Sequence, residues 1–186
     1  HGRQGASSHG QVSFGKDAAI ADPQAWRLAW YDRWLKGIEG RPVQPTPVRI
    51  FVMGGGDCVK GADGMDQHGG AWRDEQEWPL SRAKLTPYHL GKGGLLGTTT
   101  SSGSTSFIYD PKNPVPTIGG CISSNDGVML QGAWDQRGGP HIWNSLEPLP
   151  LSARNDVLVF QTPPLQENVE VTGEIDVKLW ISSSAP

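Results

Sequence analysis

The chain has 186 residues, enough for one domain or the joined parts of two. Its 16 lysines and arginines against 19 aspartates and glutamates give a formal net charge of -3, which excludes the basic surface that nucleic-acid binding needs. The 25 glycines, 15 prolines and 8 tryptophans favour a turn-rich β fold over disorder. We therefore expect a globular, mostly β protein with no nucleic-acid partner.

No apolar run approaches the roughly 20 residues that cross a bilayer, and no basic start followed by an apolar stretch indicates a signal peptide. The expectation is a soluble, cytoplasmic protein with no membrane partner, although a targeting segment further upstream would change the compartment. Cys58 and Cys121 lie far apart without metal-binding or redox spacing, which favours two ordinary thiols over a disulfide between them, for which the sequence offers no support.

Residues 1–15 are predicted as a loop with a short extended piece, and a helix follows. Asp22 is a suitable N-cap, Pro23 suits the first helical position, and Gly37 and Gly40 offer an end. Between them apolar residues recur at helical spacing and tryptophans at intervals of four: Leu28, Tyr31, Leu35 and Ile38, and Trp26, Trp30 and Trp34. We predict a helix whose wide aromatic face packs against a large neighbouring part of the protein.

The prolines of RPVQPTP, from Arg41 onward, predict a boundary between residues 1–41 and 42–186. Strand candidates follow at 47–56, 86–90, 105–111, 156–160 and 169–184. In the last candidate, apolar and polar residues alternate around Gly173, which indicates a bulge or tight turn. Short strands with frequent turns are typical of an antiparallel sandwich or jelly roll.

His68 has the most acidic surroundings of the histidines, since Asp57, Asp63 and Asp66 precede it in a glycine-rich stretch. Three carboxylates with an imidazole could hold a hard metal ion. Their spacing does not match a calcium-binding loop, and acidic glycine-rich turns are common. A solvated loop is the preferred interpretation, and no metal or other cofactor is predicted.

The other polar clusters favour structural interpretations. His89 falls in a strand candidate, and His141 falls in a loop without an obvious partner. The acidic run 73–80 could hold a general acid, but a solvated turn anchored by Trp72 and Trp78 explains it better. No Gly-x-Ser-x-Gly elbow, phosphate-binding loop, dinucleotide fingerprint or His-Glu-x-x-His occurs, so the sequence contains no complete active site.

A series of short motifs nevertheless runs in order along nearly the whole chain. They are HG…GQVSFG, LAWYDRWLKG, PVRIFVMGGG, WRDEQEWPL, TPYHL, FIYDPKNPVPTIGG, DQR, NDVLVFQTPPL and VEVTGEIDVKLWISSSA. The series resembles the cocaine-esterase and X-Pro dipeptidyl-peptidase group of serine hydrolases, which includes glutaryl acylases and α-amino-acid ester hydrolases. The combination of YDPKNPVPTIGG with VEVTGEIDVKLW is much more specific than any single motif.

The resemblance implies an α/β-hydrolase domain with a helical cap, followed by a C-terminal jelly roll that helps shape the active site. Residues 1–41 then correspond to the final loop and helix of the hydrolase domain, and residues 42–186 to the N-terminal part of the jelly-roll β-sandwich. His1-Gly2 coincides with the end of the family's Gly-Pro-Trp-x-His-Gly loop, which makes His1 the triad histidine. His9 falls on no comparable position, and the family's serine and aspartate precede the histidine.

The leading hypothesis is a part of a bacterial-type serine acyl hydrolase that cleaves a small-molecule ester, amide or peptide, with His1 as general base and then general acid. One alternative is a stand-alone β-sandwich binding module for a carbohydrate or protein partner, in which Trp134 or Trp143 stacks on sugar rings. A catalytically inactive interaction domain is another. Because both ends resemble cut positions in the family, we expect residues 1–186 alone to be inactive towards esters and poorly behaved. Acyl substrate and oligomeric state stay open.

Overall fold

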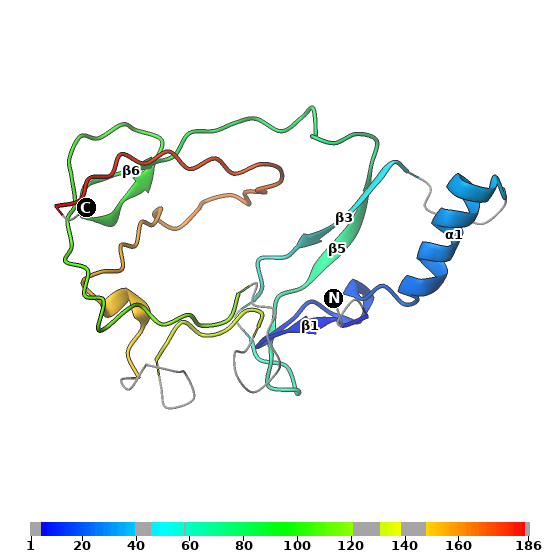
Figure 1. Ribbon diagram of the computed structural model, residues 1–186, viewed down its shortest axis with the longest axis horizontal. Coiled ribbons are helices and arrows are strands. Elements are labelled where there is room, and N and C mark those ends of the chain that lie inside the picture. The colour runs from blue at the N-terminus through cyan, green and yellow to red at the C-terminus, as the bar shows by residue number, and fades with distance from the viewer. Residues whose placement is uncertain (1–4, 40–45, 58, 121–130, 139–147, 185–186) are drawn as a thin grey trace.

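The computed structural model describes residues 5–39, 46–57, 59–120, 131–138 and 148–184. The described chain contains strands, long irregular segments and one α-helix close to the N-terminus (Figure 1). The strands are β1 (Ser8–His9), β2 (Val12–Ser13), β3 (Val48–Met53), β4 (Asp66–Gln67), β5 (Gly70–Glu75), β6 (His89–Leu90) and β7 (Leu96–Gly97). The α-helix is α1 (Pro23–Lys36), and the short 3-10 helices are η1 (Lys16–Ala18), η2 (Lys92–Gly94) and η3 (Leu151–Ala153).

Helix α1 begins and ends where its local signals predict. Asp22 accepts hydrogen bonds from the backbone N–H groups two and three residues further on, at 3.1 and 2.8 Å, which caps the first turn. Pro23 occupies the first helical position, where no N–H is needed. Gly37 follows the last helical residue with φ of 69°, a left-handed conformation that glycine adopts without strain. The predicted helix is confirmed.

The aromatic face of α1 is largely exposed in the described part of the chain. Trp26, Trp30 and Trp34 are 45%, 42% and 62% exposed, and the helix stands at one end of the molecule, clear of the sheets (Figure 1). Within the described residues the β region therefore does not cover these tryptophans. Packing against the central sheet of a hydrolase domain, the other partner that the resemblance implies, stays a prediction. The ring pairs of Trp30 are with Tyr31 and Trp34, its neighbours along the helix.

Strand pairing falls into three small sheets in the described chain. The longest pairing joins β3 and β5 antiparallel, from Val48 opposite Glu75 to Met53 opposite Gly70, and it confirms the strand predicted within 47–56. Strand β6, within the predicted 86–90, pairs antiparallel with β7. In the third sheet, β2 pairs antiparallel with β1 and parallel with β4. The N-terminal segment therefore joins a sheet with a strand from the β region.

Three predicted strands, at residues 105–111, 156–160 and 169–184, form no sheet within the described chain. Alternating apolar residues favour an extended backbone, but a strand also needs a neighbour for its N–H and C=O groups. In the last segment large side chains remain exposed, among them Trp180 at 93% and Ile181 at 89%. The turn expected at Gly173 is present, with φ of 124°, and the C-terminal segment runs back beside the chain that precedes it (Figure 1).

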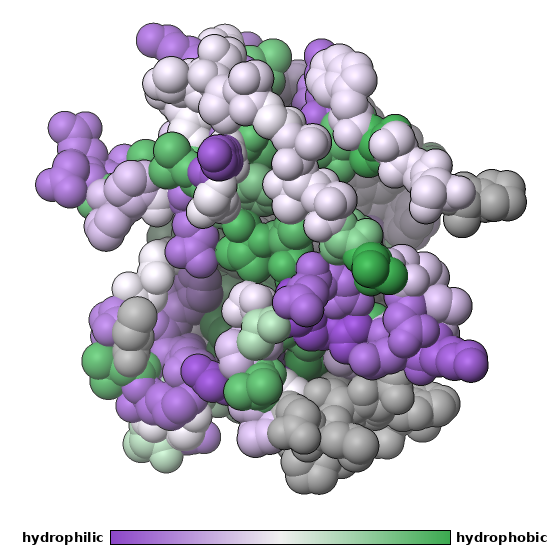
Figure 2. Space-filling view, turned by 90° about the vertical axis from the view of Figure 1, so that its left-hand side faces the viewer, coloured by the Kyte–Doolittle hydropathy of each residue, from purple (hydrophilic) through white to green (hydrophobic). Residues whose placement is uncertain are grey.

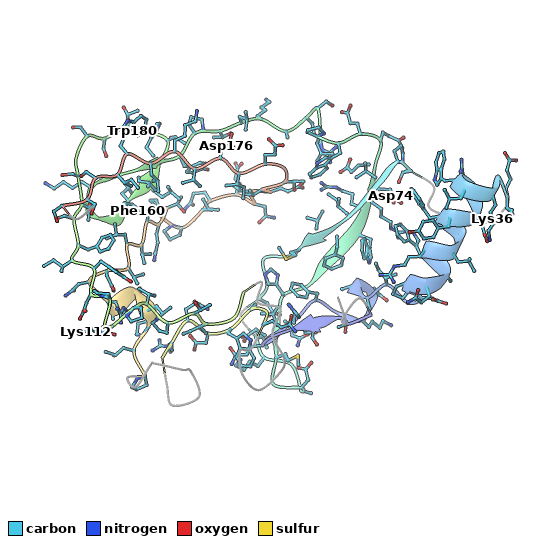
Figure 3. The ribbon with its side chains drawn as sticks, viewed as in Figure 1. Lys36, Asp74, Lys112, Phe160, Asp176 and Trp180 are labelled. Carbon is cyan, nitrogen blue, oxygen red and sulfur yellow. The ribbon has the colours of Figure 1, made fainter. Side chains whose placement is uncertain are left out.

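Few side chains of the described residues are buried. The buried apolar residues are Ala29, Leu80 and Ile118, and the buried charged residues are Asp32 and Glu75. Figure 2 shows hydrophobic side chains gathered in the middle of one face, with hydrophilic ones around them. Trp180, Phe160 and Lys112 lie towards the end of the molecule opposite Lys36 of α1 (Figure 3). The described chain therefore leaves open much apolar surface that a closed domain would cover.

We predict that residues 1–186 alone associate in solution, because the C-terminal segment combines exposed apolar side chains with unpaired backbone. Replacing both Trp180 and Ile181 by lysine should lower the weight-average mass measured by analytical ultracentrifugation at equal protein concentration. Leu85→Lys, at an 86% exposed apolar residue of another irregular segment, is the matched control and should change the mass little. A chain that is monomeric at every concentration tested contradicts this prediction.

Candidate functional site

Polar and aromatic groups meet where β2 lies beside β4. The backbone N–H of His68 donates to the carbonyl of Ser13, and that of Asp66 donates to the carbonyl of Gln11, each at 2.8 Å. The His68 ring lies against the Phe14 ring, with centroids 5.4 Å apart and planes tilted by 33°. Backbone and side-chain contacts together therefore fix residues 11–14 against residues 66–68.

An open hollow of about 300 Å³ lies beside this contact. It is lined by Gly15, Gly56, Asp57, Gln67, His68 and Gly69. Gly56 has φ of 73°, and a Cβ there would lie 3.2 Å from the carbonyl oxygen of Gln67, so glycine is needed for this close turn. The lining residues offer an imidazole, a carboxylate and an amide, and none of them carries a hydroxyl or thiol nucleophile. The described residues that line this recess thus supply no nucleophile for acyl transfer.

The carboxylates near His68 have their own local partners. Asp57 and Asp63 each accept a hydrogen bond from the backbone N–H two residues further on, at 2.9 and 3.0 Å. Asp66 pairs with Lys60 at 2.9 Å. Nδ1 of His68 is buried and has no hydrogen-bond partner in the described part of the chain. Within that part, no group of three metal-ligating side chains comes together.

The remaining predicted residues are scattered. His1, Cys58, Cys121, His141 and Trp143 lie outside the described residues. His9 lies in β1 opposite Val12, and His89 lies in β6 opposite Gly97. The structure therefore brings His68 to the recess but does not bring His89 to it.

Trp134, the residue considered for sugar stacking, is half-buried. Its indole N–H donates to the carbonyl of Gln131 at 3.0 Å. The ring lies so close to Gly119 that a Cβ there would be 2.8 Å from it. A stacking platform needs an open ring face, whereas this ring is packed onto backbone. The structure thus gives Trp134 a packing role.

The sequence analysis did not predict the ion-pair network that joins β5 to the C-terminal segment. Both terminal nitrogens of Arg73 donate to Glu170, each at 2.7 Å, and those of Arg82 donate to Glu75. Nε of Arg73 lies 2.5 Å from Glu75, a close charge contact that lacks the direction of a hydrogen bond. Because Glu170 follows Arg73 by 97 positions, no local pattern in the sequence indicates this pair.

The arginines hold both carboxylates in the ionised form. Hydrogen bonds from Arg73, with a smaller one from Thr172, lower the pKa of Glu170 to about 2. Hydrogen bonds from Arg82 lower the pKa of Glu75, although desolvation acts in the opposite direction. A carboxyl with a lowered pKa is a poor general acid near neutral pH. This argues against Glu75 as the acid considered for the run 73–80.

The solvated-turn interpretation of 73–80 is wrong at the start of the run. Asp74 and Glu75 belong to β5, and Glu75 is only 7% exposed. The physical reason is the pairing with β3 on one side and the two arginine contacts on the other. The anchoring role of Trp72 is present, since its indole N–H donates to the carbonyl of Asp17 at 2.9 Å.

The Arg73–Glu170 pair should stabilise the chain in a pH-dependent way. A carboxyl whose pKa falls on folding from 4.5 to about 2 contributes stability that is complete above pH 4.5 and is lost as pH falls towards 2. We predict that Arg73→Met lowers the urea midpoint at pH 6, and that the difference from the unchanged chain becomes small near pH 2 and disappears below it. Tryptophan fluorescence at low protein concentration measures both midpoints.

Arg49→Met is the matched control, because Arg49 makes a longer, 3.6 Å contact with Asp74 on the same sheet and lies over the Trp72 ring, 5.6 Å from its centroid. Its effect on the urea midpoint should be smaller at pH 6. A difference for Arg73→Met that persists unchanged from pH 6 to pH 2 would exclude the pair with Glu170 as its source.

Comparisons with known proteins give two matches. Residues 43–186 match the family described as the X-Pro dipeptidyl-peptidase C-terminal non-catalytic domain. The cocaine esterase of Rhodococcus sp. (strain MB1 Bresler) is 34% identical over 177 residues, which cover 89% of this chain and 26% of the esterase. The chain thus spans about a quarter of the length of that relative. No solved structure matches the chain. Within the described residues, none of the helices combines the length and the apolar character needed to cross a membrane.

Proposed function

Because the chain belongs to the family of X-Pro dipeptidyl-peptidase C-terminal domains, we propose that it forms part of a serine hydrolase. This hydrolase cleaves an ester or amide bond of a small molecule or peptide through an acyl-enzyme intermediate. The observation that carries the proposal is the 34% identity to an esterase over 89% of the chain. The part of the chain that aligns with the esterase is longer than residues 43–186, which match the domain family. The similarity to the esterase therefore continues upstream of that domain.

His1 is the catalytic histidine in this proposal. The imidazole takes the proton of a serine hydroxyl as its oxygen attacks the carbonyl carbon, and then gives that proton to the leaving group. A carboxylate orients the imidazole during both steps. The serine and the carboxylate precede His1 in the gene product, as the motif order implies. The His1-Gly2 dipeptide at the end of the family's histidine loop supports this assignment.

Residues 1–41 then form the end of a hydrolase domain, and residues 42–186 the first part of a jelly roll. The start of the family match at residue 43, and the description of that domain as non-catalytic, support this division. The described residues that line the recess beside His68 include no hydroxyl or thiol nucleophile. The jelly-roll part accordingly shapes and supports the site, and the proposed chemistry uses no cofactor.

A stand-alone binding module is the second candidate, and the structure gives it little support. Its predicted platform residue Trp134 is packed against Gly119 instead of presenting an open face. An inactive interaction domain is the third candidate, and it differs from the hydrolase in having no activated serine.

We predict that the natural gene product carrying this chain reacts with a fluorophosphonate at a serine upstream of His1. Mass spectrometry of the labelled peptide should locate the adduct on a chain heavier than residues 1–186 alone. His1→Ala should lower kcat/KM for p-nitrophenyl acetate by roughly 10⁴-fold or more and abolish rapid labelling, because the serine loses its base.

His89→Ala is the control, since His89 lies in β6 and has no place in the proposed chemistry. It should leave kcat/KM and labelling close to those of the unchanged protein. Labelling that survives His1→Ala at an unchanged rate would remove His1 from the catalytic group. An unmodified protein that takes no label would contradict the hydrolase proposal as a whole.

A further inference from the structure

Residues 174–181 alternate in sequence as a β-strand does, but they have no strand beside them in the described chain. In an extended backbone, Ile175, Val177 and Leu179 point to one face, and the residues between them point to the other. These apolar side chains are open to solvent, Ile175 at 75% and Val177 at 72%. Figure 3 shows Asp176 and Trp180 along the same stretch of chain. The segment therefore offers both an unpaired backbone and an uncovered apolar face.

The chain just before this segment is fixed to strand β5. Both terminal nitrogens of Arg73 donate to the carboxylate of Glu170 at 2.7 Å, and the hydroxyl of Thr172 donates to the same carboxylate at 2.7 Å. Gly173 then turns the chain with φ of 124°, and a Cβ there would meet no atom within 4 Å. Because one end of residues 174–181 is already held, the segment loses less conformational freedom when it pairs with another strand.

The charges of residues 174–181 are arranged so that the segment complements a second copy of itself. Two copies that pair antiparallel about a two-fold axis at Val177 place Asp176 of each copy opposite Lys178 of the other. The same register places Ile175 opposite Leu179 on the apolar face. Opposite charges and apolar side chains that lie directly across an antiparallel ladder both stabilise the pair.

Other registers of this two-fold pairing satisfy the side chains less well. An axis at Asp176 or at Lys178 puts two like charges directly opposite each other. An axis at Leu179 leaves the Asp176 carboxylate opposite Ser182, without a charge partner. An axis between two residues sets the apolar side chains of one copy beside the polar side chains of the other. Among these registers, the axis at Val177 is the one that pairs both charges and keeps the apolar faces together.

We propose that residues 174–181 are an interface between two copies of the natural gene product, joined as an antiparallel pair of strands centred on Val177. Within the described chain, Asp176 and Lys178 make no ion pair, so both charges are available to the second copy. The contact uses the same patch on each copy, which closes the assembly at two copies. The proposal is independent of the hydrolase chemistry proposed above, because its test measures mass and not activity.

Sedimentation equilibrium of the natural gene product over a range of protein concentrations tests the proposal. The unmodified protein should fit a monomer–dimer equilibrium. Asp176→Lys places two lysines opposite each other on both sides of the axis and should raise the dimer dissociation constant by about 10-fold or more. Lys178→Asp should do the same, because it places two carboxylates opposite each other.

The double variant Asp176→Lys with Lys178→Asp exchanges the charges across the axis and should restore the dissociation constant of the unmodified protein. Glu167→Lys is the matched control, since it makes the same change of net charge as Asp176→Lys at an exposed carboxylate outside residues 174–181. It should leave the dissociation constant unchanged.

Three results would overturn the proposal. The first is a natural gene product that is monomeric at every concentration, as expected if another part of that product covers residues 174–181. The second is a dimer whose dissociation constant is the same in both single variants as in the unmodified protein, since the copies then join elsewhere. The third is a double variant that dimerises no more tightly than the single variants, because paired charges then do not hold the copies together.

Discussion

Backbone hydrogen bonds between the N-terminal segment and two later parts of the chain are the constraint on which the described structure depends. Gln11 is bonded through its carbonyl to residue 66 and through its N–H to Ala133, so three distant pieces of sequence meet at one residue. Such contacts restrict the chain most where sequence separation is largest. They join residues 11–13 to the β region, although the sequence predicts a domain boundary near residue 41.

An ion pair, Arg73 with Glu170, holds the C-terminal segment where many proteins would use buried apolar side chains. With few buried apolar side chains in the described residues, the C-terminal segment is tied to β5 by the Arg73–Glu170 pair in place of a strand ladder. A two-fold guanidinium–carboxylate contact is geometrically specific, yet at an exposed site it is weak beside apolar burial. The tryptophans of α1 and the apolar residues around Trp180 thus remain surfaces that fit a larger assembly.

Local signals in the sequence were sufficient to predict α1, because Asp22, Pro23 and Gly37 act at the ends of the helix itself. Local signals also predicted β3. The family match confirms the mostly β class with a partial jelly roll. The strands expected at 105–111, 156–160 and 169–184 could not be judged locally, since pairing depends on a neighbour. The sequence also drew attention to His68 through its acidic neighbours, whereas its actual partner is Phe14, from a distant segment. His1 came from motif resemblance alone.

Amide hydrogen exchange followed by mass spectrometry on the natural gene product tests the central claim most directly. The claim is that the chain after His1 is a strand of the β region, held by residues 66–68 and 133. The account predicts slow exchange at the amides of Gln11, Asp66 and His68, all of which donate from one of these segments to another. Exchange at the three amides as fast as in an unstructured peptide would contradict it.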